Sequence, residues 1–262
     1  MDFIPYLIQN EAAFAWVLIR VAAFTAVLPI MGGLGVPRFI KVALAFTMTL
    51  VVFPIIEVAP QSLEVFPLAS GLFSEVLIGL VIGLGFRLVF AAVDLAAEME
   101  GLQMGFGIAT VFNPTLGQLG QEVSLIGQVR GLVATLIFFS VDAHHTVFEA
   151  LVYSFRRLPP MSAVLSAPLF DDLMRLAAEM FALGVKIAVP VTLVLILTNL
   201  AFGVLSRVVP QMNILLFSFP VTTAVGLIVL GTSLSFFAAV MRDRFGELGT
   251  VTFNLMEGMR PR

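Results

Sequence analysis

The sequence predicts an all-α polytopic membrane protein of about six long, partly kinked helices, arranged as hairpins, with an irregular glycine-rich loop. Composition carries the first part of this prediction. Of 262 residues, 60% are hydrophobic and 12% are charged, and the mean hydropathy is +1.06. Soluble domains are about 25% charged. A water-soluble globule of this composition would lack the polar groups needed to cover its surface, whereas lipid removes that need.

Apolar residues gather in six stretches that approach the roughly 20 residues of a membrane helix. They are Glu11–Met31, Phe39–Ile56, Phe66–Val93, Val123–Val141, Leu176–Val204 and Met212–Val240. The third, fifth and sixth are too long for a simple crossing, because a helix of about 29 residues spans ~43 Å against a hydrocarbon core of ~30 Å. Pro190 and Pro220 lie inside the last two stretches and predict kinks. We therefore expect many of these helices to face other subunits.

The connections give a divided signal on orientation. Arg38 and Lys41 place the first loop inside and, since the second loop is acidic, the N-terminus outside. The fourth loop, with Arg156, Arg157 and Arg175, favours the opposite orientation. The whole chain, residues 1–262, reads as one membrane domain, with an amphipathic C-terminal tail at about 241–262.

Four cations fall well inside the apolar stretches: Arg20, Arg87, Arg130 and Lys186. Each would cost ~2.5–3.5 kcal/mol at the centre of a bilayer. Arg20 lies mid-stretch, and Arg87 follows the small-residue stripe Gly79–Gly83, which favours close helix contact. We expect these two to be buried against protein. The other two are expected to reach an interface or to pair with an acid on a neighbouring helix.

Residues that could carry catalysis are missing. The chain has no cysteine, which excludes disulfides and thiolate chemistry. Asp142-Ala143-His144-His145 holds the histidines but not the further ligands of a zinc motif. Asp94, Glu98 and Glu100 are interpreted as a solvated helix end. With a net charge of -3, nucleic acid is not an expected partner. We predict no metal, no cofactor and no enzymatic activity.

The glycine-rich connection at about 101–122 is the most informative segment. Its glycines and proline make a continuous helix improbable, and we interpret Gly101, Gly105, Gly107 and Pro114 as loop hinges. It also carries Met104, Phe106, Ile108, Val111 and Phe112. Apolar, irregular backbone at membrane depth must be buried in protein or line a cavity. Two interpretations remain open: a plug or constriction formed by these five side chains, and a re-entrant hairpin that only packs.

Three motifs carry a resemblance to a known family. They are Glu98–Pro114, with its GLQMGFGIATVFNP core; Leu205–Ile214, with an arginine followed by Pro-Gln-x-Asn; and Phe219–Thr222, which reads Phe-Pro-Val-Thr. Together they resemble the FliR family of flagellar biosynthetic proteins. Relatives of that family are the matching export-gate subunits of virulence type III secretion systems. The resemblance covers the chain in length and segment order.

The resemblance implies a non-enzymatic export-gate subunit of the flagellar basal body in the bacterial inner membrane. Family members assemble with FliP and FliQ into a pore for unfolded flagellar proteins, with FlhB docked on the assembly and FlhA coupling energy. In the family the glycine-rich loop contributes to the apolar constriction. Here Ile108 and Val111 occupy positions that are often aromatic in relatives, with Phe106 and Phe112 beside them.

A second set of residues is predicted to contact partner subunits, with a simple loop as the alternative: Arg207, Pro210, Gln211, Asn213 and Pro220.

Two other functions stay open beside the flagellar export gate. One is a secondary transporter or ion channel acting alone, since broken helices and midplane charges occur there too. The other is a virulence export-gate subunit.

Overall fold

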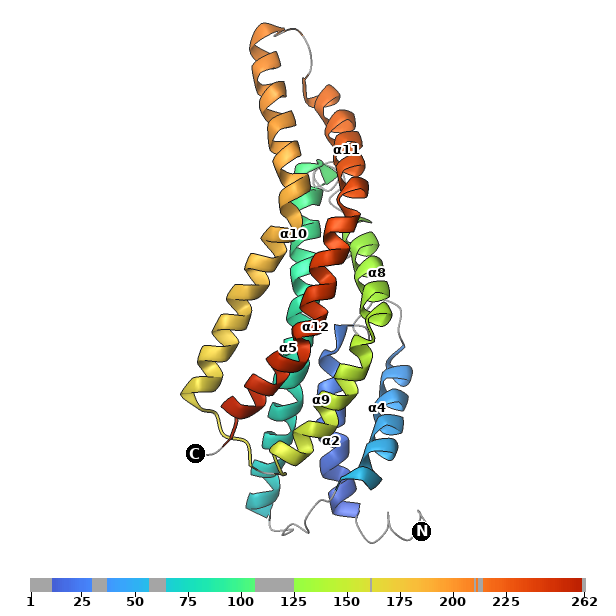
Figure 1. Cartoon of the computed structure of the whole chain (residues 1–262), viewed down its shortest axis with the longest axis vertical. Coiled ribbons are helices and arrows are strands. Elements are labelled where there is room, and N and C mark those ends of the chain that lie inside the picture. The colour runs from blue at the N-terminus through green and yellow to red at the C-terminus, as the bar shows by residue number, and fades with distance from the viewer. Residues whose placement is uncertain are drawn as a thin grey trace. The chain divides into compact units, whose positions relative to one another are not determined.

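The computed structural model describes residues 11–29, 37–56, 65–106, 125–160, 162–209, 211 and 214–260. Within these ranges every regular element is helical (Figure 1). The prediction of an all-α protein is confirmed.

Eight α-helices and one short 3-10 helix make up the described chain. They are α2 (Glu11–Val27), α4 (Arg38–Val52), η1 (Phe53–Ile55), α5 (Val65–Gln103), α8 (Leu125–Ser140), α9 (Ala143–Arg157), α10 (Ala167–Val208), α11 (Ile214–Thr232) and α12 (Leu234–Gly258).

Three of the described helical stretches are long and apolar enough to cross a membrane: Arg38–Ile55, Gly71–Gln103 and Ala167–Val208. Two bent pairs, α8 with α9 and α11 with α12, raise the total to five if each pair counts as one span. The excess length predicted for the third and fifth stretches is confirmed in α5 and α10. The 42-residue α10 would be ~63 Å long at 1.5 Å per residue, about twice the hydrocarbon core.

Several helix boundaries differ from those predicted. The third apolar stretch continues beyond Val93 to Gln103, because Asp94 and Glu98 lie on the exposed side of α5 while Ala96 and Ala97 are buried. In the sequence, these two acidic residues on one face of an amphipathic helix resembled a solvated helix end. The sixth stretch is interrupted at Ser233, and Pro220 lies within α11. Helix α9 is not among the predicted stretches, since polar residues interrupt its apolar run.

The C-terminal tail is helical, as its spacing predicts. Helix α12 runs to Gly258. The tail buries one stripe of apolar side chains: Phe245, Leu248, Leu255, Met256 and Met259. This stripe packs within the protein.

The chain forms two compact units whose segments alternate in sequence. The first unit comprises Met1–Leu88, Asp142–Ala177 and Gly246–Arg262; the second comprises Val89–Val141 and Ala178–Phe245. Helices α5, α10 and α12 each contribute residues to both units.

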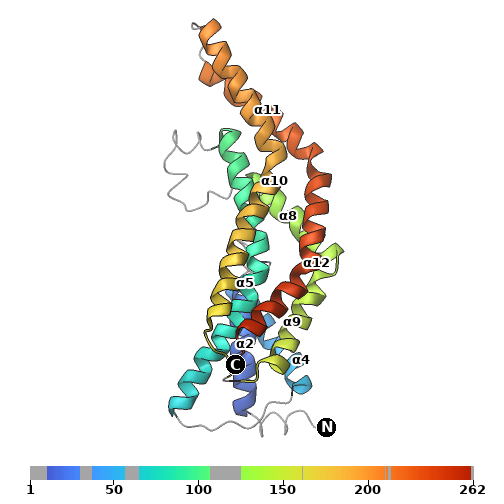
Figure 2. The ribbon, with the colours of Figure 1, turned by 60° about the vertical axis from the view of Figure 1, so that its left-hand side comes forward.

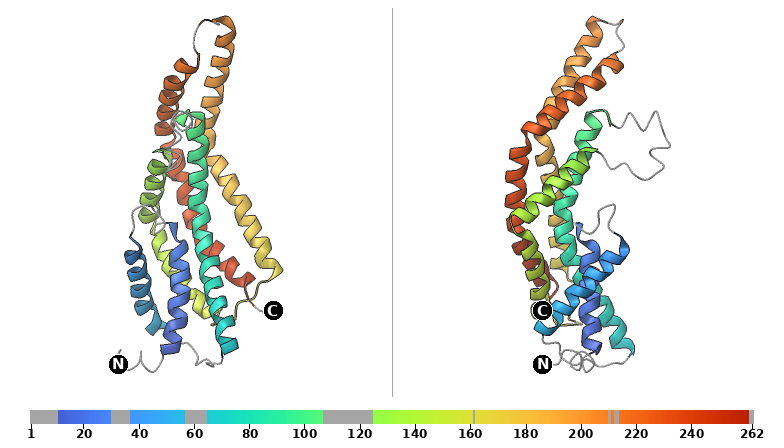
Figure 3. Two further views of the ribbon diagram at one scale, coloured as in Figure 1. Left: turned by 180° about the vertical axis from the view of Figure 1, so that it is seen from behind. Right: turned by 90° about the vertical axis from the view of Figure 1, so that its right-hand side faces the viewer.

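In the first unit, α2 packs against α4, and glycines bring α2 close to α5 (Figure 3). A Cβ atom on Gly79 would lie 2.5 Å from the Arg20 carbonyl oxygen, and one on Gly83 would lie 3.1 Å from the Phe24 carbonyl oxygen. The predicted packing role of the Gly79–Gly83 stripe is therefore confirmed. The rings of Phe24 and Phe86 meet edge to face beside it, with centroids 6.1 Å apart.

In the second unit, the C-terminal part of α10 and α11 run side by side as a hairpin (Figures 1 and 2). Helix α5 packs against α10 at Gly184, where a Cβ atom would lie 3.0 Å from the Ala92 carbonyl oxygen. The unit's core contains Ala97, Ile126, Val191 and Leu195. These residues come from α5, α8 and α10, so the core joins helices that are far apart in sequence.

Candidate functional site at the base of the glycine-rich connection

Helix α5 ends on a glycine turn where the glycine-rich connection begins. Met104 N donates to the Glu100 carbonyl at 2.9 Å, and Gly105 N donates to the Leu102 carbonyl at 3.2 Å. Gly105 has a φ of 89°, in the left-handed region that commonly terminates helices at glycine. The predicted bend at Gly105 is thus present in the backbone.

A buried ion pair joins the two helices that flank the connection. Arg130 of α8 donates from Nε to Glu100 Oε2 at 2.8 Å and from Nη2 to Glu100 Oε1 at 2.6 Å. Glu100 lies in the last turn of α5, before the connection, whereas α8 follows it. Their side chains are 0% and 2% exposed, and Arg130 also lies over the Phe237 ring at 5.0 Å. This bidentate pair, which we call the clasp, fastens the stem of the loop.

Helix α11 supplies a further attachment. Thr223 Oγ1 donates to the Met104 carbonyl oxygen at 3.0 Å. That carbonyl lies at the C-terminus of α5, where carbonyls lack a partner in their own helix. The base of the connection is therefore held by α8 through charge and by α11 through a hydrogen bond.

The structure describes three residues predicted to act in the loop. Met104 is 0% exposed and belongs to the core of the second unit, so within this chain it packs in the core. Gly101 is helical and buried, which makes its assignment as a loop hinge wrong. Phe106 is half-buried and packs against the same core. The other predicted loop residues lie outside the described residues: Gly107, Ile108, Val111, Phe112 and Pro114.

The predicted subunit-contact residues are partly described. Arg207 in the last turn of α10, Gln211 in the following turn and Pro220 in α11 are all exposed. Pro210 and Asn213 lie outside the described residues. Exposure leaves the first three available to a neighbour, and their role stays a prediction.

Arg20 forms the corresponding buried pair of the first unit. Its Nε and Nη2 donate to Glu75 Oε2 and Oε1 at 2.6 and 3.0 Å. Nη1 donates to Ser154 Oγ at 3.2 Å and Nη2 to the Leu158 carbonyl at 2.9 Å, while the guanidinium lies 4.1 Å above the Phe155 ring. Both charged side chains are 0% exposed. The arginine thus links α2, α5 and the end of α9.

The structure bears on two predictions about charge. Arg87 is exposed within this chain, because helical spacing places it on the same face of α5 as Leu80 and Asp94, which are also exposed. Its burial against other protein stays a prediction that concerns a partner subunit. Glu100 does not belong to a solvated helix end, since it faces α8 while Glu98 faces outward. Lys186 is exposed on α10.

Sequence reasoning missed the acidic partners, Glu75 and Glu100. Both lie within α5, inside an apolar helical run. Because an isolated buried charge is costly, an arginine in one apolar stretch predicts an acid in another. A search of the apolar stretches for an acidic residue to match each arginine would have indicated Glu75 and Glu100.

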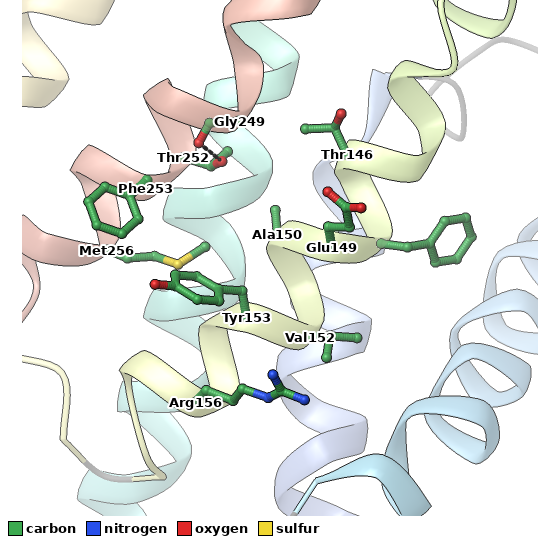
Figure 4. Close-up of a pocket in the computed structure, with 11 residues that line it drawn as sticks. Thr146, Glu149, Ala150, Val152, Tyr153, Arg156, Gly249, Thr252, Phe253 and Met256 are labelled. Atoms are coloured by element: carbon green, nitrogen blue, oxygen red, sulfur yellow. Dashed lines mark hydrogen bonds between the residues drawn. The ribbon is translucent and has the colours of Figure 1, made fainter.

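The first unit also contains an apolar pocket between α9 and the end of α12 (Figure 4). Its volume is about 520 Å³. Phe253 and Met256 of α12 face Ala150 and Tyr153 of α9 across it. Glu149 and Arg156 are among the polar residues that line it.

One group among the described residues could hold a metal ion. The donor atoms of Asp142, His144 and His145 lie within 4.8 Å of one another. Three ligands are fewer than a structural zinc site uses, whereas catalytic zinc sites use three protein ligands and a water. The absence of a metal stays a prediction.

Comparison with known proteins decides the family. The sequence profile of the family "Bacterial export proteins, family 1" matches residues 12–248. The chain belongs to this family. It is 34% identical over 248 residues to the flagellar biosynthetic protein FliR of Bacillus subtilis (strain 168), covering 91% of the chain and 92% of that relative. FliR of Pectobacterium carotovorum subsp. carotovorum is 31% identical over 244 residues, covering 92% of each chain.

FliR of Escherichia coli (strain K12) is a third such relative, 30% identical over 243 residues, with 93% of the chain and 90% of the relative covered. The resemblance found in the sequence motifs is confirmed. Membership of the FliR family extends over nearly the whole chain, so both compact units belong to it.

Proposed function

We propose that this FliR-family protein is a structural and gating subunit of the flagellar type III protein export apparatus. Membership of the bacterial export family and full-length similarity to flagellar FliR proteins support the role in export. The role is structural, without catalysis. Its long apolar helices place it in a membrane, which we propose is the bacterial inner membrane at the flagellar basal body.

The gating element is the glycine-rich connection. The observation that carries this proposal is the clasp: two hydrogen bonds between Glu100 and Arg130 join the two helices that flank the connection. A closed base lets the intervening apolar residues act as one unit that seals a pathway and moves aside for an unfolded chain. Phe106, Ile108, Val111 and Phe112 form the seal in this proposal, with Met104 as its anchor.

Partner subunits cover the apolar faces that the single chain leaves exposed. Helix α10 exposes Val189, Leu193, Leu197 and Leu200 to its surroundings, and it is too long for lipid alone to cover. We propose that FliP and FliQ pack against such faces, that FlhB docks on the assembly and that FlhA couples energy to it. The exposed residues Arg207, Gln211 and Pro220 belong to this contact surface.

Purification tests the assembly. The tagged protein, extracted in mild detergent, is expected to bring down the FliP and FliQ proteins of its own organism in a stable complex. A stable monomer that transports a small solute in liposomes would contradict the proposal and favour a lone transporter. Recovery with the subunits of a virulence system would place the protein in that apparatus.

Deletion tests the gate. Removing Gly105–Pro114 is expected to make assembled complexes leak ions or small molecules across the membrane of living cells. Complex recovery is measured in parallel, so that leakage is compared at equal amounts of assembly. Assembled complexes that stay tight after the deletion would show that the connection does not seal the pathway.

A further inference from the structure

Two residues of helix α11 contact Met104, at the base of the glycine-rich connection. Its Gly226 lies directly under the Met104 side chain. A Cβ atom on Gly226 would lie 2.6, 2.7 and 3.0 Å from Met104 Cε, Cγ and Sδ. An alanine here would force the buried Met104 side chain to move, because its Cβ would fall within 3.0 Å of three successive Met104 atoms.

One helical turn before Gly226, Thr223 holds the backbone of the same residue. Its hydroxyl donates to the Met104 carbonyl oxygen at 3.0 Å. The neighbouring Thr222 hydroxyl lies 3.5 Å from that oxygen but is closer to the Ser218 carbonyl of its own helix, at 2.8 Å. Thr223 is therefore the donor to Met104, and α11 grips this residue by both side chain and backbone.

We infer that Thr223 and Gly226 are positioning residues that set where the sealing loop begins. This inference rests on the proposed gating function. Met104 immediately precedes Gly105, whose φ of 89° turns the chain into the connection. Displacing Met104 is therefore expected to disturb this turn. Since α11 follows directly on the predicted subunit contacts around Gln211, a partner that moves α11 would also move the loop.

Substitution of Gly226 supplies the main test. In the assembled export complex, Gly226→Ala is expected to raise ion leakage several-fold, because the new methyl group displaces Met104. Gly231→Ala on the same helix is the matched control, since a Cβ atom there would meet nothing within 4 Å. Adding Met104→Ala removes the collision. Gly226→Ala should then have no further effect beyond that of Met104→Ala alone.

Thr223 gives an independent measurement. Thr223→Val is expected to raise leakage, Thr223→Ser to restore tightness, and Thr232→Val on the same helix to change nothing. The Thr232 hydroxyl bonds to the Val229 carbonyl of its own helix. A purely structural role would lower complex recovery in step with leakage, whereas a positioning role changes leakage per assembled complex.

A disulfide test separates this inference from the gating proposal. Met104→Cys with Gly226→Cys in the naturally cysteine-free chain is expected to form a disulfide under mild oxidation. Failure of the disulfide, or equal leakage for Gly226→Ala and Gly231→Ala, would overturn the inference while the Gly105–Pro114 deletion still leaks. If that deletion does not leak, the gating proposal itself fails, and the disulfide then reports the packing alone.

Discussion

Glu100 and Arg130 form two hydrogen bonds, 2.8 and 2.6 Å long, between the two helices that flank the glycine-rich connection. Arg20 and Glu75 form a second pair of the same kind in the other unit. Both acids lie on α5. Each arginine also lies over a phenylalanine ring, Phe237 in one case and Phe155 in the other. Each buried charge among the residues that the structure describes is thus paired with an opposite charge on another helix.

Glu100→Gln is expected to destabilise the protein by about 3–5 kcal/mol, because it leaves the Arg130 charge buried without its counter-charge. Thermal unfolding of the purified complex in detergent measures the loss. Glu98→Gln, on the exposed side of the same helix, is the matched control and should change little. Equal melting of the two variants would show that the clasp contributes nothing to stability.

Replacing both members of the second pair is expected to cost less than removing one. Arg20→Met leaves the Glu75 carboxylate without its main partner and should destabilise by about 3–5 kcal/mol, whereas Arg20→Met with Glu75→Met replaces two buried charges with apolar groups. Denaturation of both variants and of Glu75→Met completes a double-mutant cycle. Strictly additive losses would mean that the two residues do not interact.

Gly79→Ala is expected to destabilise the packing of α2 on α5. The new methyl group would lie 2.5 Å from the Arg20 carbonyl oxygen, and backbone cannot yield as a flexible side chain can. Gly246→Ala on α12 has open space around it and should stabilise its helix by up to about 1 kcal/mol, from intrinsic propensity. Opposite shifts in melting temperature are therefore predicted, and a stabilising effect of Gly79→Ala would contradict the close approach.

Arg207→Glu is expected to reduce recovery of partner subunits several-fold, because it reverses an exposed charge at the tip of the α10–α11 hairpin. Pull-down of the tagged protein, followed by quantification of each partner, measures this. Arg242→Glu reverses an exposed charge elsewhere in the second unit and should leave recovery unchanged. If both variants retain their partners equally, the hairpin tip is a simple loop.

Composition and apolar run length were sufficient for the helical membrane class, because lipid permits a hydrophobic surface that water does not. Spacing was sufficient for the Gly79–Gly83 contact and the amphipathic tail. Helix ends were harder to predict. Asp94 and Glu98 resembled a terminus, yet α5 continues because its opposite face stays apolar.

Side-chain partners could not be predicted from local pattern. Arg20 pairs with Glu75, and Glu100 pairs with Arg130, through contacts that bring distant helices together. Arg87, by contrast, projects outward. Its exposure depends on which face of α5 packs against other helices, and that face is not the one that carries Leu80 and Arg87. The sealing role of Ile108, Val111 and Phe112 remains a proposal from the sequence and the family.

Cross-linking to a stalled export substrate tests the central proposal, that the glycine-rich connection seals the export pathway, most directly. Single cysteines replace Ile108 or Phe112 in the cysteine-free chain, and the substrate carries one cysteine in the segment held within the channel. The account predicts disulfide adducts from both positions and none from Phe253→Cys, on the surface of the first unit. If complexes are assembled and stalled but neither loop position forms an adduct, the result would contradict the account.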